Sequence, residues 1–80
     1  MASELIENLA RIHTTELGVV RIKRNLGLEV VDAVEWCKEK IKHPTSLIAR
    51  KGKNWYITTD ECVITVNAHS YTIITAHKRK

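Results

Sequence analysis

The chain has 80 residues, of which 44% are hydrophobic and 28% charged, and its net charge is +4. This composition excludes a disordered protein, and a chain of this length forms one domain with a small core. Because no apolar run is long enough to cross a membrane and no signal peptide precedes residue 10, we expect a cytoplasmic protein. Its two cysteines lie within apolar patterns, which predicts reduced thiols in the core.

The positive charge is unevenly distributed along the chain. Residues 1–42 contain seven basic and seven acidic side chains, whereas residues 43–80 contain six basic and two acidic ones. A basic C-terminal half favours a polyanionic partner such as RNA. The alternative is that residues 78–80 form a solubilising basic tail, because these three residues supply most of the excess.

Three helices are predicted in the first half of the chain. Residues 1–12 place four apolar side chains at helical spacing: Leu5, Ile6, Leu9 and Ile12. A second helix begins at Thr14 or Thr15 as its N-cap and ends at Leu26, with Gly27 as a left-handed stop. A third helix runs from Glu29 to Lys42, with an apolar stripe that consists of Val30, Val34, Cys37 and Ile41.

After Pro44 the apolar period changes from about 3.6 to about two, which predicts a sheet over residues 45–77. Residues 47–51 and 54–58 form a hairpin around Gly52, with Ile48 opposite Ile57 and Ala49 opposite Tyr56.

Two further strands, residues 61–67 and 70–77, are joined by Ala68 and His69. The predicted register of these two strands has three pairs: Val66 with Tyr71, Ile64 with Ile73, and Cys62 with Thr75. It places Thr75 and His77 on the helix-facing side of the sheet. The predicted fold is therefore α+β, with three N-terminal helices packed on a four-stranded antiparallel meander.

The side chains exclude several kinds of chemistry. No pair of histidines or cysteines has the spacing of a zinc site, and no glycine-rich loop is present, so we expect no metal and no cofactor. What remains is a set of His, Arg, Asn and Thr side chains, which suits binding or cleavage of a phosphodiester. RNA supplies its own nucleophile, so cleavage needs only proton transfer and cations, and histidine can serve in either proton role.

Three segments carry a resemblance to known proteins: HTTELGVVRIKRNL, GKNWY and ITVNAHSYTIITAHK. They resemble a family of short bacterial and phage-associated proteins classified as a domain of unknown function, over about residues 12–78. The order of elements is similar to that of the barnase–EndoU–colicin–RelE-like ribonucleases. This second resemblance implies a metal-independent ribonuclease or a toxin-like RNA-binding domain.

We assign functional roles to eight residues, and six of these roles follow from the ribonuclease resemblance by analogy: His13, Arg21, Asn67, Thr72, Thr75 and His77. Arg24 and Lys53 are included because Arg24 belongs to the cationic edge of the second predicted helix and Lys53 lies beside Trp55 and Tyr56. The catalytic set is His13, Arg21, Thr75 and His77, which we expect to converge around one cleft. The nucleic-acid-binding set is Arg24, Lys53, Asn67 and Thr72.

Two other interpretations stay open. The domain is a non-catalytic binding module for RNA or protein, with Trp55 and Tyr56 exposed beside Lys51 and Lys53 for stacking on bases. Alternatively, the unpaired edge of the sheet forms a homodimer. No interpretation involves a membrane.

Overall fold

The computed structural model describes residues 2–79. Its helical elements, in chain order, are α1 (Ala2–Glu7), a 3₁₀ turn (Leu9–Arg11), α2 (Glu16–Leu26) and α3 (Ala33–Ile41). Its strands are β1 (Leu47–Lys51), β2 (Asn54–Thr58), β3 (Cys62–Asn67) and β4 (Ile73–Lys78). The strands form one antiparallel sheet in the order β1-β2-β3-β4, which confirms an α+β fold.

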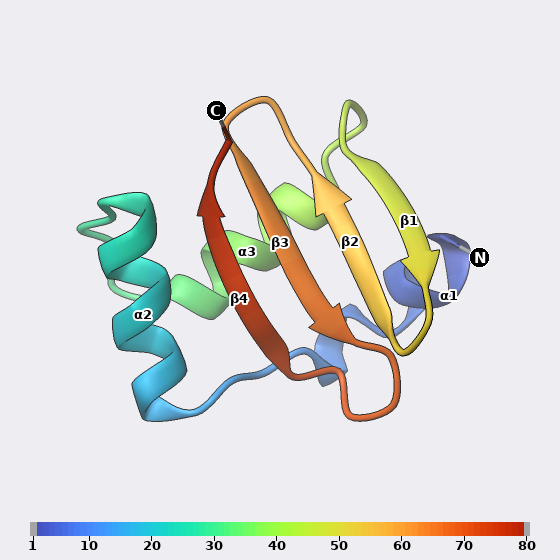
Figure 1. The fold of residues 1–80 in the computed structure, drawn as a ribbon, viewed down its shortest axis with the longest axis horizontal. Helices are drawn as coiled ribbons and strands as arrows, with labels where there is room; N and C mark the ends of the chain where they lie inside the picture. Colours follow the sequence, from blue (N-terminus) through green and yellow to red (C-terminus); the bar gives the residue numbers. More distant parts are fainter. Residues whose placement is uncertain (1, 80) are drawn as a thin grey trace.

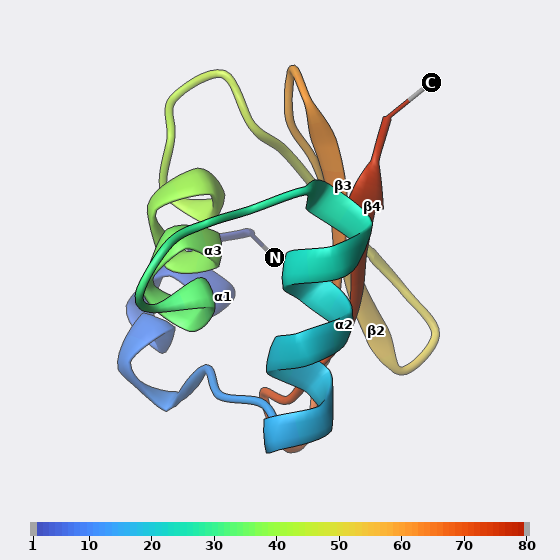
Figure 2. The same cartoon turned by 90° about the vertical axis from the view of Figure 1, so that its left-hand side faces the viewer.

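The helices leave one face of the sheet uncovered. Helices α1 and α3 lie behind the sheet in Figure 1, and α2 runs alongside β4 at the edge of the sheet. The side view in Figure 2 places α1, α3 and α2 on the same side of the strands. We call the covered side the inner face and the other side the outer face.

The core lies between the inner face and the helices. Among its fully buried side chains are Leu5, Ile22, Cys37, Ile41, Trp55, Ile57, Cys62, Ile64 and Val66. Strands β2 and β3 contribute alternate residues, as a half-buried strand must, and the helices contribute residues three or four positions apart. No helix within residues 2–79 has the length and apolar character that a bilayer-spanning segment needs.

The hairpin of β1 and β2 confirms the predicted register. Ile48 pairs with Ile57 and Ala49 pairs with Tyr56. Gly52 occupies the first position of the two-residue turn with φ of 61°, a conformation that favours glycine.

The predicted register of β3 and β4 is wrong. Val66 pairs with Ile73, not with Tyr71, and Thr65 pairs with Thr75. The connection is longer than expected because Tyr71 adopts a left-handed φ of 59° and donates its main-chain N–H to the Asn67 carbonyl at 2.9 Å. Strand β4 therefore begins at Ile73.

A β-bulge then reverses the faces of β4. Ile74 is the extra residue between Ile73 and Thr75, where the register shifts. After the bulge Ala76 is the buried residue, while Thr75 and His77 lie on the outer face. The prediction that these two side chains face the helices is therefore wrong.

The predicted bounds of two helices also need correction. Helix α1 ends at Glu7 because Asn8 leaves helical geometry and donates its side-chain amide to the Glu4 carbonyl at 2.8 Å. Helix α3 begins at Ala33, since the Asp32 carboxylate caps it by accepting the Glu35 N–H at 3.0 Å.

The N-terminal half closes the β4 edge of the sheet. His13 forms a parallel bridge to Thr72, and its main-chain carbonyl accepts the Ile73 N–H at 2.8 Å. The Thr14 hydroxyl donates to the Ile73 carbonyl at 3.1 Å, and the Asn25 amide donates to the Ala76 carbonyl at 3.2 Å. This edge is therefore satisfied within the domain, whereas β1 forms the other edge of the sheet.

The orientation of β4 can be tested by substituting alanine for each of two neighbouring isoleucines and comparing the loss of stability. Ile73 is 2% exposed and Ile74 is 49% exposed. Ile73→Ala should lower the free energy of unfolding by about 2–5 kcal/mol through lost burial and the cavity left behind. Ile74→Ala should lower it by less than about 1 kcal/mol. Chemical denaturation measures both, and equal losses would contradict the placement of β4.

Candidate functional site

The outer face consists of three rows of side chains that run across the strands. The first row is Lys51, Asn54 and Asn67. The second is Ala49, Tyr56, Thr65 and Thr75. The third is Leu47, Thr58, Val63 and His77. None of these residues is acidic.

Tyr56 is the aromatic side chain of this face. It is 36% exposed and contributes to an open depression whose other lining residues are Ala49, Lys51 and Gly52. Thr65 lies between Tyr56 and Thr75 in the second row and is 7% exposed. The central row therefore places an aromatic ring between Ala49 on one side and the hydroxyl group of Thr65 on the other.

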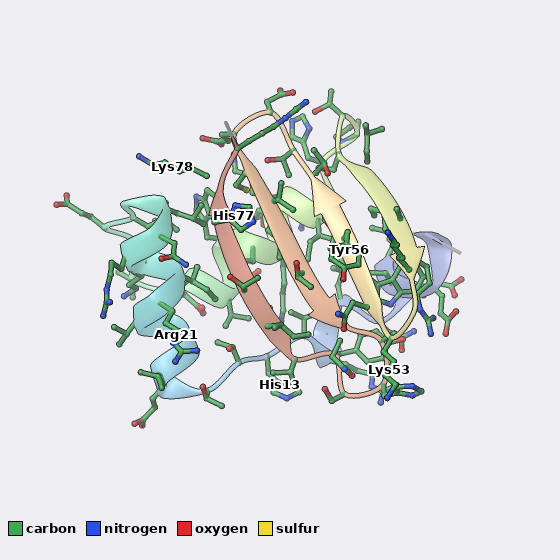
Figure 3. All side chains as sticks on the ribbon, in the orientation of Figure 1. His13, Arg21, Lys53, Tyr56, His77 and Lys78 are labelled. Carbon is green, nitrogen blue, oxygen red and sulfur yellow. The ribbon has the colours of Figure 1, made fainter. Side chains whose placement is uncertain are left out.

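Basic side chains gather where the β1–β2 turn meets the β3–β4 connection. The Lys53 carbonyl accepts the Ala68 N–H at 2.7 Å, which joins the two turns. Lys51 and Lys53 are exposed in the first turn and His69 in the second. We call this part of the sheet the hairpin end; it lies at the bottom of Figure 3, where Lys53 and His13 are labelled.

The acidic residues nearest to the sheet lie at its opposite end. Asp60 and Glu61 form the turn between β2 and β3, and Glu61 is paired with Lys40 of α3. Lys78 and Arg79 lie at this same end, opposite Cys62 and Glu61, so this end of the sheet carries charges of both signs.

Three of the eight predicted site residues are connected at the hairpin end. His13 Nε2 lies 3.1 Å from the Thr72 hydroxyl, which lies 2.8 Å from the Ser70 hydroxyl. The Ser70 hydroxyl lies 3.2 Å from Asn67 Oδ1. The chain of contacts thus runs from His13 through Thr72 and Ser70 to Asn67, and Lys53 lies beside it through its contact with Ala68.

Both ring nitrogens of His13 have partners within the protein. Nδ1 lies 2.9 Å from the Arg11 carbonyl, which can only accept, so Nδ1 carries the proton of the neutral ring. Nε2 then accepts from the Thr72 hydroxyl. His13 is therefore positioned as a structural link, with neither nitrogen directed at a substrate.

The predicted catalytic set does not converge. His77 is five residues beyond Thr72, the bridge partner of His13, so about 16 Å of strand separates them. Arg21 is exposed on α2, and Thr75 lies on the outer face in β4, the strand at the edge of the sheet. The expected single cleft is wrong because the bulge in β4 turns Thr75 and His77 away from α2.

One of the four nucleic-acid-binding assignments, Arg24, also lies apart from the others. Lys53 and Asn67 lie at the hairpin end, whereas Arg24 is exposed on α2. The expected exposure of Trp55 is wrong: it is 1% exposed, and the Arg50 guanidinium lies 5.4 Å from its ring centroid. Adjacent strand residues face opposite sides, so the burial of Ile57 already places Trp55 inside and Tyr56 outside.

Ser70 is the linking residue that received no role from the sequence. Its position directly after Asn67-Ala68-His69 fits a turn in which the asparagine side chain accepts main-chain N–H groups, which is the signal that would have indicated it.

The cysteines are not candidates for nucleophilic chemistry. Both Cys37 and Cys62 are free thiols without solvent exposure. Burial, together with the nearby Cys62, raises the pKa of Cys37 to about 12, and burial also raises the pKa of Cys62. Within residues 2–79, no three His, Cys, Asp or Glu side chains gather as a metal site requires.

The fold and this face define a small α+β domain with an open, partly basic sheet surface. The chain belongs to the DUF3781 family, described as proteins of unknown function, whose model matches residues 6–77. Neither a curated protein nor a solved structure matches the chain.

The raised thiol pKa values predict poor reactivity in the folded protein. Between pH 8 and 9 neither cysteine should react appreciably with iodoacetamide, because the reactive thiolate is scarce and buried. Both should react in denaturant, where the pKa returns to about 8.5. Intact-mass measurement counts the adducts, and rapid labelling of the native protein would contradict the burial of these thiols.

Proposed function

We propose that this domain binds single-stranded RNA on the outer face of its sheet, without cleaving it. The observation that carries this proposal is the uncovered row of Ala49, Tyr56, Thr65 and Thr75, which is free of acidic residues and lies next to the row that contains Lys51. Open sheets with exposed aromatic side chains bind single strands by stacking, and nearby cations hold the phosphates.

The arrangement of charge supports a particular orientation of the strand. The exposed Lys51 and Lys53 attract phosphates to the hairpin end, whereas the opposite end carries Asp60 and Glu61 together with Lys78 and Arg79. A base stacked on Tyr56 then has its phosphate near Lys51, because both residues line the same depression.

The proposal excludes cleavage on geometric grounds. His13 bridges Thr72, which precedes His77 by five residues along the chain, so the two histidines are too far apart to act on one phosphate. In addition, both ring nitrogens of His13 have partners, the Arg11 carbonyl and the Thr72 hydroxyl. The ribonuclease resemblance thus contributes the substrate class and not the reaction.

Binding can be tested with a short labelled RNA and three variants. Tyr56→Ala should weaken binding by about 5- to 150-fold, the value of one stacked base. Lys51→Ala with Lys53→Ala should also reduce the slope of log affinity against log salt by about 1.4, since each phosphate contact in a single strand contributes about 0.7. Fluorescence anisotropy at several salt concentrations measures both effects.

Lys38→Ala with Lys42→Ala is the matched control, because it also removes two positive charges, from the last turn and the C-cap of α3, away from the outer face. It should leave both affinity and salt slope unchanged. If all lysine variants act alike, binding depends on net charge alone and the proposed face is wrong.

Cleavage is tested separately by incubating RNA with the wild-type protein in the presence of a chelator. We expect intact RNA at every pH. A product that disappears in both His13→Ala and Arg21→Ala would overturn the binding-only proposal and restore the catalytic one.

A further inference from the structure

Asn67 is held more firmly than any other polar side chain described on the outer face. Its main-chain N–H donates to the Thr72 carbonyl, and its own carbonyl accepts the Tyr71 N–H, each at 2.9 Å. Its side-chain oxygen Oδ1 accepts the N–H groups of His69 and Ser70, also at 2.9 Å. Since a main-chain N–H can only donate, the oxygen and nitrogen of this amide are unambiguously placed.

The amide nitrogen of Asn67 is left with two unused donors. No hydrogen bond from Nδ2 to any residue within 2–79 is formed, although the side chain is half-buried. The turn therefore uses the acceptor of this side chain and fixes its donor group. A ligand group that contacts Nδ2 must be an acceptor.

An acceptor and an aromatic ring accompany this donor. Asn54 is directly opposite Asn67, so their Cβ atoms lie about 4.5–5.5 Å apart. The Asn54 amide nitrogen contacts the Tyr56 hydroxyl at 3.4 Å, which leaves its Oδ1 available as an acceptor. Tyr56 is the diagonal neighbour of Asn67, at about 7–8 Å.

We propose that Asn67 reads the base stacked on Tyr56 and selects uracil over cytosine. This inference rests on the proposed RNA binding. The two pyrimidines differ where uracil has the acceptor O4 and cytosine has the donor N4. The Asn67 amide donates to O4, and Asn54 Oδ1 accepts the neighbouring N3–H of the same base. Cytosine would bring its amino group against the fixed donors of Asn67.

The base is a better ligand for Asn67 than a phosphate for two reasons. The donor lies beside the ring on which a base stacks, and the exposed Lys51 and Lys53 already provide cations for the phosphate. A phosphate contact would also make affinity independent of the base, which an experiment can distinguish.

The test compares oligo(U) with oligo(C), which carry the same backbone charge. Wild type should bind oligo(U) about 5- to 10-fold more tightly than oligo(C). This factor corresponds to the free energy of one hydrogen bond that uracil forms and of one unpaired donor that it avoids. Asn67→Asp keeps an acceptor for the His69 and Ser70 N–H groups but replaces the donors with a carboxylate. It should remove the preference for oligo(U), because cytosine then donates N4–H to the carboxylate, whereas uracil loses its O4 contact and keeps only the N3–H contact with Asn54.

Charge repulsion by the new carboxylate is controlled in two ways. It weakens both oligonucleotides equally, so the ratio of their affinities is unaffected by it. Thr58→Asp adds a carboxylate elsewhere on the outer face and should keep the wild-type ratio. Asn67→Ser also retains an acceptor for the turn but lacks the amide donors, so it should bring the ratio of the oligo(U) and oligo(C) affinities close to one. It replaces Asn67→Asp in the test if that variant has a lowered melting temperature.

The outcomes separate this inference from the proposed function. If wild type binds neither oligonucleotide, RNA binding itself is wrong. If wild type binds both equally, or if Asn67→Asp weakens both by the same factor, Asn67 contacts phosphate or solvent and base reading is wrong. Only a uracil preference that follows the Asn67 amide supports it.

Discussion

The backbone pairing of His13 with the start of β4 is the constraint on which the rest of the structure depends. His13 accepts from Ile73 and donates to the Tyr71 carbonyl at 3.1 Å, so it behaves as a one-residue fifth strand. Thr14 and Asn25 continue this edge with side-chain hydrogen bonds to β4 carbonyls. These contacts hold α2 against β4 at the edge of the sheet.

The same region determines which side chains reach that face. Tyr71 takes a left-handed conformation that a bulky residue adopts at a cost of roughly 1–2 kcal/mol. Its buried ring, the Arg11 guanidinium 4.6 Å from the ring centroid, and two main-chain hydrogen bonds offset that cost. The bulge at Ile74 follows directly, and it alone moves Thr75 and His77 from the inner to the outer face.

The sequence was sufficient where local rules decide the structure. Gly52 marks a two-residue turn, and alternation from Ile48 to Ile57 then sets the β1–β2 register. The sequence did not determine the register of β4, because neither a tyrosine in the left-handed conformation nor a bulge without glycine has a reliable signal in a single sequence. The candidate site reflects this division. Asn67 and Thr72 were predicted and do share the hairpin end with His13, but the catalytic grouping depended on the face of Thr75 and His77, which the bulge at Ile74 reverses.

A polar sheet face does not by itself indicate binding, because threonine favours strands whether or not a ligand is present. Thr58, Thr65 and Thr75 are therefore weak evidence. Three features distinguish this face: an exposed Tyr56, a Lys51 with no acidic residue in the three rows, and an Asn67 amide whose acceptor holds the turn while its donors have no partner within residues 2–79. A fixed donor beside a ring can discriminate between ligands, because its orientation is already determined before anything binds.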